Sequence, residues 1–400
     1  MTLFDLCCQN AVALTAEYDE ELHVFTRIAE TPNPAFIPLG ARDGSGTATK
    51  ARLSSWWHGR AIPVTRDGFR TLEADLDGLS PMDLLDRSLG LSLSDQYWLR
   101  PQGSRLLWEE VNFFDNGFDG QLGLLTLGSL GSFTRKTLDA SPLNPNSSLG
   151  GNLKKAWEKK GDVIRLVKAG SAPFEQEPVN EAIATALHRR LLQPTDFTPY
   201  HLEQRDERLY SICPDMVDRD ECLVPAWDII NAAKRPGHLS PWQNLLKRYD
   251  ELGVPAAREQ LERVFVCDYL IANHDRHWNN LGVIFDARTM EAKRVAPIFD
   301  SGSSLWCDAP ELVVPRDYWY RPLPLVNERA RRIQPEEQLA LMTDLSWLSL
   351  EKLEGFAEEA ARILAQHGKL PPERVEAIRR GIERNIEHLA AYVRRVRNGK

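Results

Sequence analysis

The chain has 400 residues, of which 42% are hydrophobic and 26% are charged, and its formal net charge is −8. This composition is typical of a soluble globular protein, and the length favours a two-lobed body or two to three domains. General nucleic-acid binding needs a basic surface, so the acidic balance argues against direct nucleic-acid binding. No run of about 18 apolar residues occurs, so no transmembrane helix is expected.

The N-terminal segment MTLFDLCCQN contains Asp5 and has no basic region, so it does not resemble a secretory signal peptide. The six cysteines are few for this length and form no CxxC pair. Reduced thiols are the simplest interpretation, and we expect a cytoplasmic protein. The cysteines are Cys7, Cys8, Cys213, Cys222, Cys267 and Cys307.

Residues 1–135 contain short apolar runs that are broken by Gly, Pro, Asp and Asn. The run LHVFTRI at 22–28 mixes β-branched and aromatic residues and predicts a strand. The stretches 54–68 and 113–123 are predicted to be turn-rich with aromatic anchors. Because the region has no concentrated acid–base cluster, we expect it to be strand-rich and to pack on, or extend, the lobe that follows it.

Asn, Pro, Ser and Gly dominate the first part of residues 136–161, which predicts a loop and the main boundary of the chain. The β-branched run DVIRLVKAG at 162–170 then predicts a strand. A helix is predicted over 175–192, because Pro178 suits a first turn and apolar residues recur on one face. A second short strand is predicted at 208–216. The apolar helix positions are Ile183, Ala186, Leu187 and Leu191.

From about residue 220 the sequence becomes mainly helical. The segment 255–273 predicts a buried helix, strands are predicted at 281–286 and 294–300, and residues 335–398 are predicted to be helical. A strand-rich half followed by a helical half predicts an α+β, two-lobed body. Its expected parts are residues 1–135, 136–217 and 218–400. The apolar stripe of the buried helix is Leu261, Val264, Phe265, Tyr269 and Ala272.

Polar side chains cluster in IANHDRHWNNLGVIFD at 271–286, directly after this helix. Asp275 and Asn280 lie on the same loop, and Asp300 follows the second predicted strand about twenty residues later. Two strands joined by a turn would bring Asn280 and Asp300 together, and an amide oxygen beside a carboxylate suits Mg²⁺. Asp275 is then free to orient an incoming hydroxyl, which is the division of labour that phosphoryl transfer needs.

A nucleotide-binding part is predicted upstream of this cluster. The loop SSLGGN at 147–152 contains glycines whose backbone N–H groups could face phosphate oxygens. Lys168 can reach the α- and β-phosphates from the end of its strand, and Glu181 on the next helix could hold it extended. The adenine is expected against the connection 210–216. The predicted nucleotide contacts are Ser148, Gly150, Gly151, Asn152, Lys168, Cys213 and Met216.

Taken in order, these motifs resemble those of HipA-like serine/threonine kinases, the toxin-type kinases of bacterial toxin–antitoxin systems. The catalytic loop of that family has the form Asp-x-His-x-x-Asn, which is matched here by Asp275, His277 and Asn280. The family's metal-binding Asp corresponds to Asp300 in APIFDSG, and its strand lysine corresponds to Lys168 in IRLVK. The resemblance therefore implies an enzyme that uses ATP and Mg²⁺.

The resemblance further implies a protein-kinase-like fold, in which 136–217 forms the core of the N-lobe and 218–400 forms the helical C-lobe. It implies a protein substrate with a Ser/Thr acceptor, an antitoxin-like partner, and autophosphorylation at Ser147 or Ser148 in SSLGGNLKK. A phosphate there would add a charge of about −1.5 to −2 beside the nucleotide and would favour self-inhibition. The catalytic residues implied are Asp275, Lys168, Glu181 and His277.

Three alternatives stay open. The sequence Asp-Arg-His-x-x-Asn is also similar to the catalytic loop of phosphatidylinositol 3/4-kinases, although no basic membrane helix supports a lipid acceptor. His274, Asp275 and His277 could hold the metal of a hydrolase or an HNH-like nuclease, which would leave Lys168 and Glu181 without a role. The chain could also be an inactive nucleotide-binding regulator, but its base, metal and lysine positions are all filled.

Overall fold

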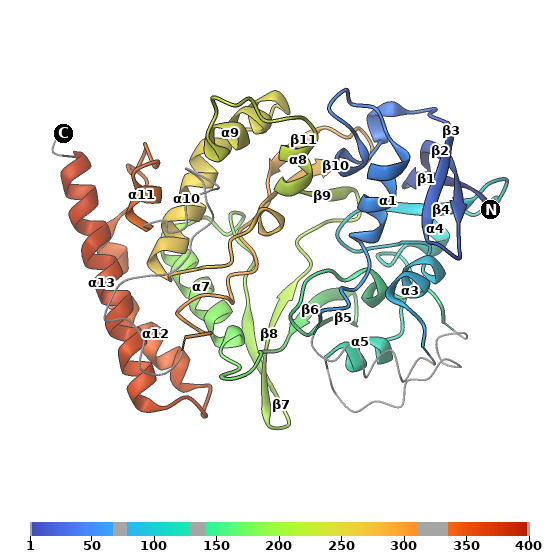
Figure 1. Ribbon diagram of the computed structural model, residues 1–400. Coiled ribbons are helices and arrows are strands. Elements are labelled where there is room, and N and C mark those ends of the chain that lie inside the picture. Colours follow the sequence, from blue (N-terminus) through green and yellow to red (C-terminus); the bar gives the residue numbers. More distant parts are fainter. Residues whose placement is uncertain (1, 67–77, 128–140, 310–334, 398–400) are drawn as a thin grey trace.

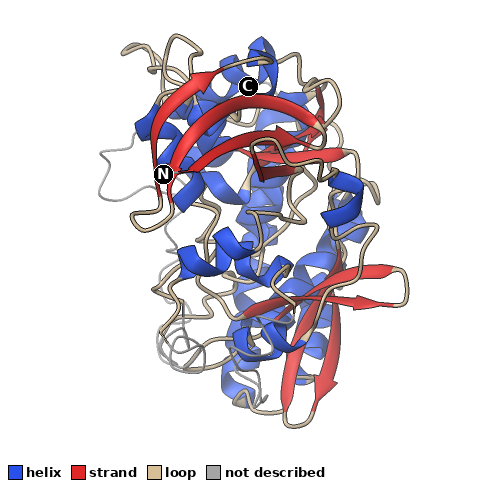
Figure 2. Ribbon diagram, turned by 90° about the vertical axis from the view of Figure 1, so that its right-hand side faces the viewer, coloured by secondary structure: helices blue, strands red, loops and turns tan. Residues whose placement is uncertain are grey.

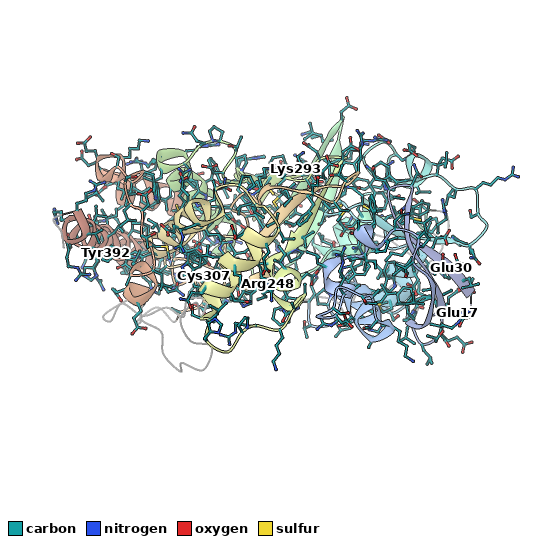
Figure 3. The ribbon with its side chains drawn as sticks, turned by 90° about the horizontal axis from the view of Figure 1, so that it is seen from above. Glu17, Glu30, Arg248, Lys293, Cys307 and Tyr392 are labelled. Carbon is teal, nitrogen blue, oxygen red and sulfur yellow. The ribbon has the colours of Figure 1, made fainter. Side chains whose placement is uncertain are left out.

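The computed structural model describes residues 2–66, 78–127, 141–309 and 335–397. Three antiparallel sheets follow one another along the chain, and helices dominate its last part (Figure 1). Glu17 and Glu30 of the first sheet lie at one end of the molecule, and Tyr392 of the last helix lies at the other (Figure 3). Among the described helices, none combines the length and the apolarity that crossing a bilayer requires.

The first sheet lies in the N-terminal region and has the strand order β3-β2-β1-β4. The strand predicted at 22–28 is confirmed as β3, shifted by two residues. The turn-rich prediction for 54–68 is wrong at its start, because the helix α1 continues to residue 58. This helix forms because the Thr49 side chain accepts a hydrogen bond from the Arg52 amide, and because Leu53 and Trp57 are buried one turn apart. The elements are β1 (Thr2–Cys8), β2 (Ala11–Asp19), β3 (Val24–Glu30), α1 (Lys50–His58), α3 (Pro81–Arg87), β4 (Tyr97–Pro101), α4 (Trp108–Val111) and α5 (Gln121–Thr126).

The second sheet has the order β5-β6-β8-β7, and α7 packs against β7 and β8. The predicted strands at 162–170 and 208–216 and the helix at 175–192 are confirmed within a few residues. The lysine-rich end of 136–161 was expected to be a loop, but it forms β5. Lysine is uncommon in strands, yet pairing with β6 and burial of Ala156 and Trp157 outweigh that preference. The elements are β5 (Lys155–Lys160), β6 (Val163–Lys168), α7 (Glu177–Leu191), β7 (His201–Arg205) and β8 (Arg208–Pro214).

The third sheet, of order β11-β10-β9, contacts α8 and α10. The buried helix predicted at 255–273 is confirmed as α10, and its predicted stripe is buried. The strand predicted at 294–300 is wrong beyond Val295, where the chain leaves the sheet and Ile298 makes only an isolated bridge with Phe197. The elements are β9 (Glu221–Pro225), α8 (Ala226–Asn231), α9 (Pro241–Glu251), α10 (Ala257–Leu270), β10 (Gly282–Asp286), β11 (Ala292–Val295), α11 (Pro335–Leu339), α12 (Phe356–Ala365) and α13 (Pro372–Arg397).

The N-terminal region packs against the rest of the chain. Figure 2 shows the strands in separate groups with helices behind and between them. The amide of Leu223 on β9 donates to the Ser94 carbonyl at 2.8 Å, and the Gln96 side chain donates to the Glu221 carbonyl at 2.7 Å. One buried apolar cluster also includes side chains from the first sheet, α7, α10 and α13. This packing places residues before 127 within reach of the predicted phosphate loop.

Candidate active site

Lys168 lies at the centre of a polar cluster that joins its strand to three other segments. Its Nζ donates to Glu181 Oε1 at 2.7 Å, to Asp300 Oδ1 at 2.9 Å and to the Tyr200 hydroxyl at 3.1 Å. The strand β6 ends at Lys168, and α7 places Glu181 about one turn into the helix. The other oxygen of Glu181 accepts from the Ser301 amide at 3.0 Å. The predicted pair of Lys168 and Glu181 is therefore present, and Asp300 joins it.

The charges in this cluster are strongly coupled. Burial disfavours the charged form of Lys168, but Asp300 and Glu181 outweigh it and hold the pKa of the ammonium well above its ordinary value. Burial also opposes ionisation of Asp300, but Lys168 and Lys155 outweigh it and hold the pKa of that carboxyl below its usual range. Burial raises the pKa of Glu181. Two carboxylates, Glu181 and Asp300, therefore share the Lys168 ammonium, and Lys155 adds a second positive charge near Asp300.

The loop after α10 is fixed by Arg276, which is only 2% exposed. Its guanidinium makes a bidentate ion pair with Asp268, through Nε at 2.9 Å and Nη2 at 3.0 Å. It also donates to the Asn280 carbonyl at 3.0 Å, to the Phe299 carbonyl at 2.5 Å and to Ser301 Oγ at 3.0 Å. Arg276 thus ties the loop to the segment that contains Asp300, which is a structural role and not phosphate binding.

Asp275 and Asn280 lie on opposite sides of a short turn in this loop. The amide of Asp275 donates to Asn273 Oδ1 at 3.1 Å, and Asn280 Nδ2 donates to the Asp275 carbonyl at 3.0 Å. Because Asn280 uses its nitrogen in this bond, Oδ1 is the atom that could meet a metal. Asp275 is exposed, yet partial desolvation raises the pKa of its carboxyl; His277 opposes this shift and Asp300 adds to it. Exposed His277 accepts from the Asn279 amide at 3.2 Å, a bond within its own loop.

A 3₁₀ turn at Pro145–Ser148 contains the first two residues of the predicted phosphate loop, 147–152. Ser147 is 1% exposed and donates to the Asn144 carbonyl at 2.6 Å, while Ser148 donates to the Leu91 carbonyl at 2.7 Å. Both hydroxyls are therefore engaged in this conformation, and either would have to leave its partner before accepting a phosphate. Gly150, Gly151 and Asn152 are exposed.

Lys155 is a site residue that the sequence analysis did not name. A Cβ on Gly151 would lie 2.7 Å from Lys155 Nζ, so the loop backbone runs directly beside this amine. Burial lowers the pKa of Lys155 to about 8, although the nearby charge of Asp300 opposes the shift. Lys155 pairs with Lys168 across β5 and β6, so it links the loop to the Lys168 cluster. Lys155 is the second lysine of GGNLKK in the sequence. Its place beside Lys168 depends on the strand β5, which the sequence did not predict.

The expected adenine contacts lie along and just after β8. Cys213 is buried and pairs with Leu166 across the sheet, and burial raises the pKa of its thiol to about 12. Met216 is half-buried, and its sulfur accepts a bond from Thr198 Oγ1 at 3.5 Å. Between them, burial raises the pKa of the Asp215 carboxyl to about 8. The Cys213 thiol interacts electrostatically with Lys168, so the sheet brings this residue near the cluster.

A different grouping of metal-binding side chains lies beside the catalytic loop. Among the described residues, His274, Cys307 and Asp308 have ligand atoms within 4.8 Å of one another, and neither Asp275 nor His277 belongs to this group. His274 Nε2 and Asp308 Oδ2 are 3.7 Å apart. The His–Asp–His site of the hydrolase alternative therefore has no support in this geometry.

No protein-family model matches the sequence, and no curated protein matches it either. Several solved structures resemble the fold, including the following two. A Helicobacter pylori proinflammatory kinase, CtkA, has 17% identity and a TM-score of 0.46, over 58% of this chain and 89% of its own. HipA from the Shewanella oneidensis MR-1 toxin–antitoxin complex of HipA, HipB and operator DNA has 16% identity and a TM-score of 0.55, over 99% of this chain and 100% of its own.

At this identity a structural likeness is informative about the fold. The full-length match to HipA confirms the predicted α+β, two-lobed architecture, with a strand-rich N-terminal part and a helical C-terminal part. We conclude that the chain has a HipA-like kinase fold.

Proposed function

We propose that the protein is a kinase that transfers the γ-phosphate of ATP to a Ser or Thr hydroxyl of a protein, with Mg²⁺ as its metal ion. The observation that carries this proposal is the Lys168 ammonium, bonded to both Glu181 at 2.7 Å and Asp300 at 2.9 Å in a HipA-like fold. A buried lysine held by a helix carboxylate beside a metal-type carboxylate is the arrangement that kinases use to align phosphates.

The donor set suits Mg²⁺. Asp300 is an ionised carboxylate and Asn280 offers an amide oxygen, and both are hard oxygen ligands of the kind that Mg²⁺ prefers. Bound there with the nucleotide, Mg²⁺ would neutralise charge on the phosphates.

The remaining residues supply positioning and proton transfer. Lys168 and the amides of 150–152 would hold phosphate oxygens, and Lys155 adds a second positive charge beside the loop. Cys213 and Met216 would contact the adenine. Asp275 would orient the acceptor hydroxyl, and its raised pKa favours accepting the proton as the new bond forms.

Autophosphorylation at Ser147 or Ser148 is part of the proposal. Both hydroxyls are engaged with backbone carbonyls, so phosphorylation would require the loop to open and would oppose its return. A phosphorylated loop would repel the nucleotide, which supports self-inhibition. We also propose an antitoxin-like protein partner, because the HipA match comes from a complex with HipB, and a cytoplasmic location, because all six cysteines are free and buried.

The test is incubation of the purified protein with γ-labelled ATP and Mg²⁺, beside Asp275→Ala, followed by intact-mass analysis and phosphopeptide mapping. Label on a serine of the wild type, absent from the variant, supports the kinase and identifies the acceptor. Binding of ATP without any transfer or hydrolysis would favour the inactive regulator. Transfer to phosphatidylinositol, with no label on protein, would favour the lipid kinase.

A further inference from the structure

Side chains of the N-terminal region hydrogen-bond to the predicted phosphate loop. Arg66, which is 4% exposed, donates from its guanidinium to three consecutive carbonyls of the loop. Nε meets the Gly151 carbonyl at 3.0 Å, and Nη2 meets the carbonyls of Gly150 at 3.1 Å and of Leu149. The neighbouring Thr65 hydroxyl donates to Asn152 Oδ1 at 2.9 Å. Two adjacent residues therefore contact four consecutive loop residues.

This contact orients the loop amides. A trans peptide unit carries its C=O and its N–H on opposite sides. Since the carbonyls of Leu149, Gly150 and Gly151 point to Arg66, the N–H groups of Gly150, Gly151 and Asn152 point away from it. A run of amides facing one way forms an anion-binding concavity. The Arg66 guanidinium thus turns the loop so that its donors are available to phosphate oxygens.

The charge of Arg66 supports the same conclusion. Among the described residues its hydrogen-bond partners are neutral carbonyls, Nη1 is buried without a partner, and burial lowers the pKa of the guanidinium to about 10. By contrast Arg60, a buried arginine of the same region, is paired with Asp95 at 2.7 Å. A buried cation whose described partners are neutral is costly, and an anionic ligand at the loop would offset that cost.

We propose that Arg66 is a positioning residue that holds the phosphate loop in its nucleotide-binding form, so that the N-terminal region is part of the ATP site. This inference rests on the proposed function and assigns a role to residues before 135, for which the sequence offered only packing. Arg66 would act through the loop backbone, and its effect would be confined to the phosphate part of the nucleotide.

The test compares Arg66→Met with Arg42→Met. Arg42 is a matched control, because it also donates to backbone carbonyls in the N-terminal region, those of Ala35 and Ile37, and makes no bond to the loop. Affinities for ATP and for adenosine are measured by calorimetry and competition on the full chain. Arg66→Met should weaken ATP binding about tenfold and leave adenosine binding unchanged. Arg42→Met should change neither, and Arg66→Lys should be intermediate, since one ammonium cannot reach three carbonyls as a fork does.

A general loss of structure would lower the affinity for both ATP and adenosine, so the ratio of the two affinities is the deciding quantity. A folded Arg66→Met variant with the wild-type ratio would overturn the inference. If Arg66→Met does not fold, Arg66→Lys is judged by the same ratio. Failure of nucleotide binding, the part of the proposed function on which the inference rests, has a different signature, because the wild-type protein itself would then bind neither ATP nor adenosine. Failure of transfer alone would show in the labelling experiment and would leave the ratio of the two affinities unchanged.

Discussion

Lys168 and Asp300 are 132 residues apart in the sequence, and their side chains meet at 2.9 Å in the interior. The contact joins the end of β6 to the segment after β11. It therefore places the predicted phosphate-binding lysine beside the predicted metal-binding carboxylate. Lys168 forms direct ion pairs with both Glu181 and Asp300, so its positive charge stabilises two carboxylates at once.

Lys168→Met should therefore damage both stability and binding. It leaves the buried Glu181 and the half-buried Asp300 without their ammonium, and we expect a loss of about 2–4 kcal/mol in the free energy of unfolding together with loss of ATP affinity. Chemical denaturation and calorimetry measure the two effects. Lys247→Met is the control, since Lys247 is an exposed partner of Glu251 on α9 and should cost less than about 0.5 kcal/mol. Equal stabilities of the two variants would contradict this prediction.

Asp300→Asn tests the metal role, although it also weakens the ion pair with Lys168. Asp300 has a positive φ of 55°, a conformation that Asn tolerates, so the backbone should be preserved. The variant lacks the carboxylate charge, and we expect ATP affinity to become nearly independent of Mg²⁺. Titration of ATP with and without Mg²⁺ provides the measurement, with exposed Asp162→Asn as the control. A Mg²⁺ dependence equal to that of the wild type would exclude Asp300 as a ligand.

Asp275→Asn should separate binding from transfer. The variant keeps the shape of the side chain but cannot accept a proton, so phosphoryl transfer should fall by about 10²–10⁴-fold while ATP affinity stays the same. Because the pKa of Asp275 is raised, wild-type transfer should decline with falling pH at a pH above the ordinary range of an aspartate. Single-turnover rates across pH test both statements. Exposed Asn279→Ala on the same loop is the control, and full activity of Asp275→Asn would reject the base assignment.

The parts of this site that the sequence predicted share a physical cause. The segments β6, α7 and α10 are marked by β-branched or periodic apolar residues, and the motif residues lie within these segments or soon after them, so their order along the chain was visible. The residue roles remain predictions, but Lys168, Glu181 and Asp300 do come together.

The parts that the sequence missed depend on tertiary contacts. The strand β5 is rich in lysine, a poor strand former, and exists because β6 pairs with it and Trp157 is buried. Without that strand, Lys155 could not be placed opposite Lys168. Arg66 is 83–85 residues from the carbonyls that it binds, and no local pattern marks such a contact.

Gly151→Ala tests the shape of the loop. Gly151 has a φ of +87°, which is unfavourable for any residue with a Cβ, and an added Cβ would also displace Lys155 Nζ. We expect a loss of about 1 kcal/mol in stability and weaker ATP binding. Gly150→Ala is the control for stability, because its Cβ would meet open space and its φ is not positive. The prediction fails if the two alanine variants unfold at the same denaturant concentration.

Asp215→Asn should stabilise the protein in a pH-dependent way. Burial raises the pKa of Asp215 from 3.8 to about 8, and its Oδ2 is buried without a partner among the described residues. A carboxyl with a raised folded-state pKa contributes stability that is complete below 3.8 and is lost as the pH rises towards about 8. Asn is neutral at every pH and can still accept from the Val217 amide, which donates to Oδ1 at 3.1 Å.

The variant should therefore match the wild type near pH 4 and exceed it by about 1–3 kcal/mol near pH 9. Urea unfolding at several pH values gives the difference, and exposed Asp250→Asn on α9 controls for the general effect of removing one negative charge. A difference between Asp215→Asn and wild type that stays constant from pH 4 to pH 9 would show that this carboxyl ionises in the folded protein as it does in the unfolded chain. The connection after β8 would then be open to water, and the burial that we assign to the adenine side of the site would be wrong.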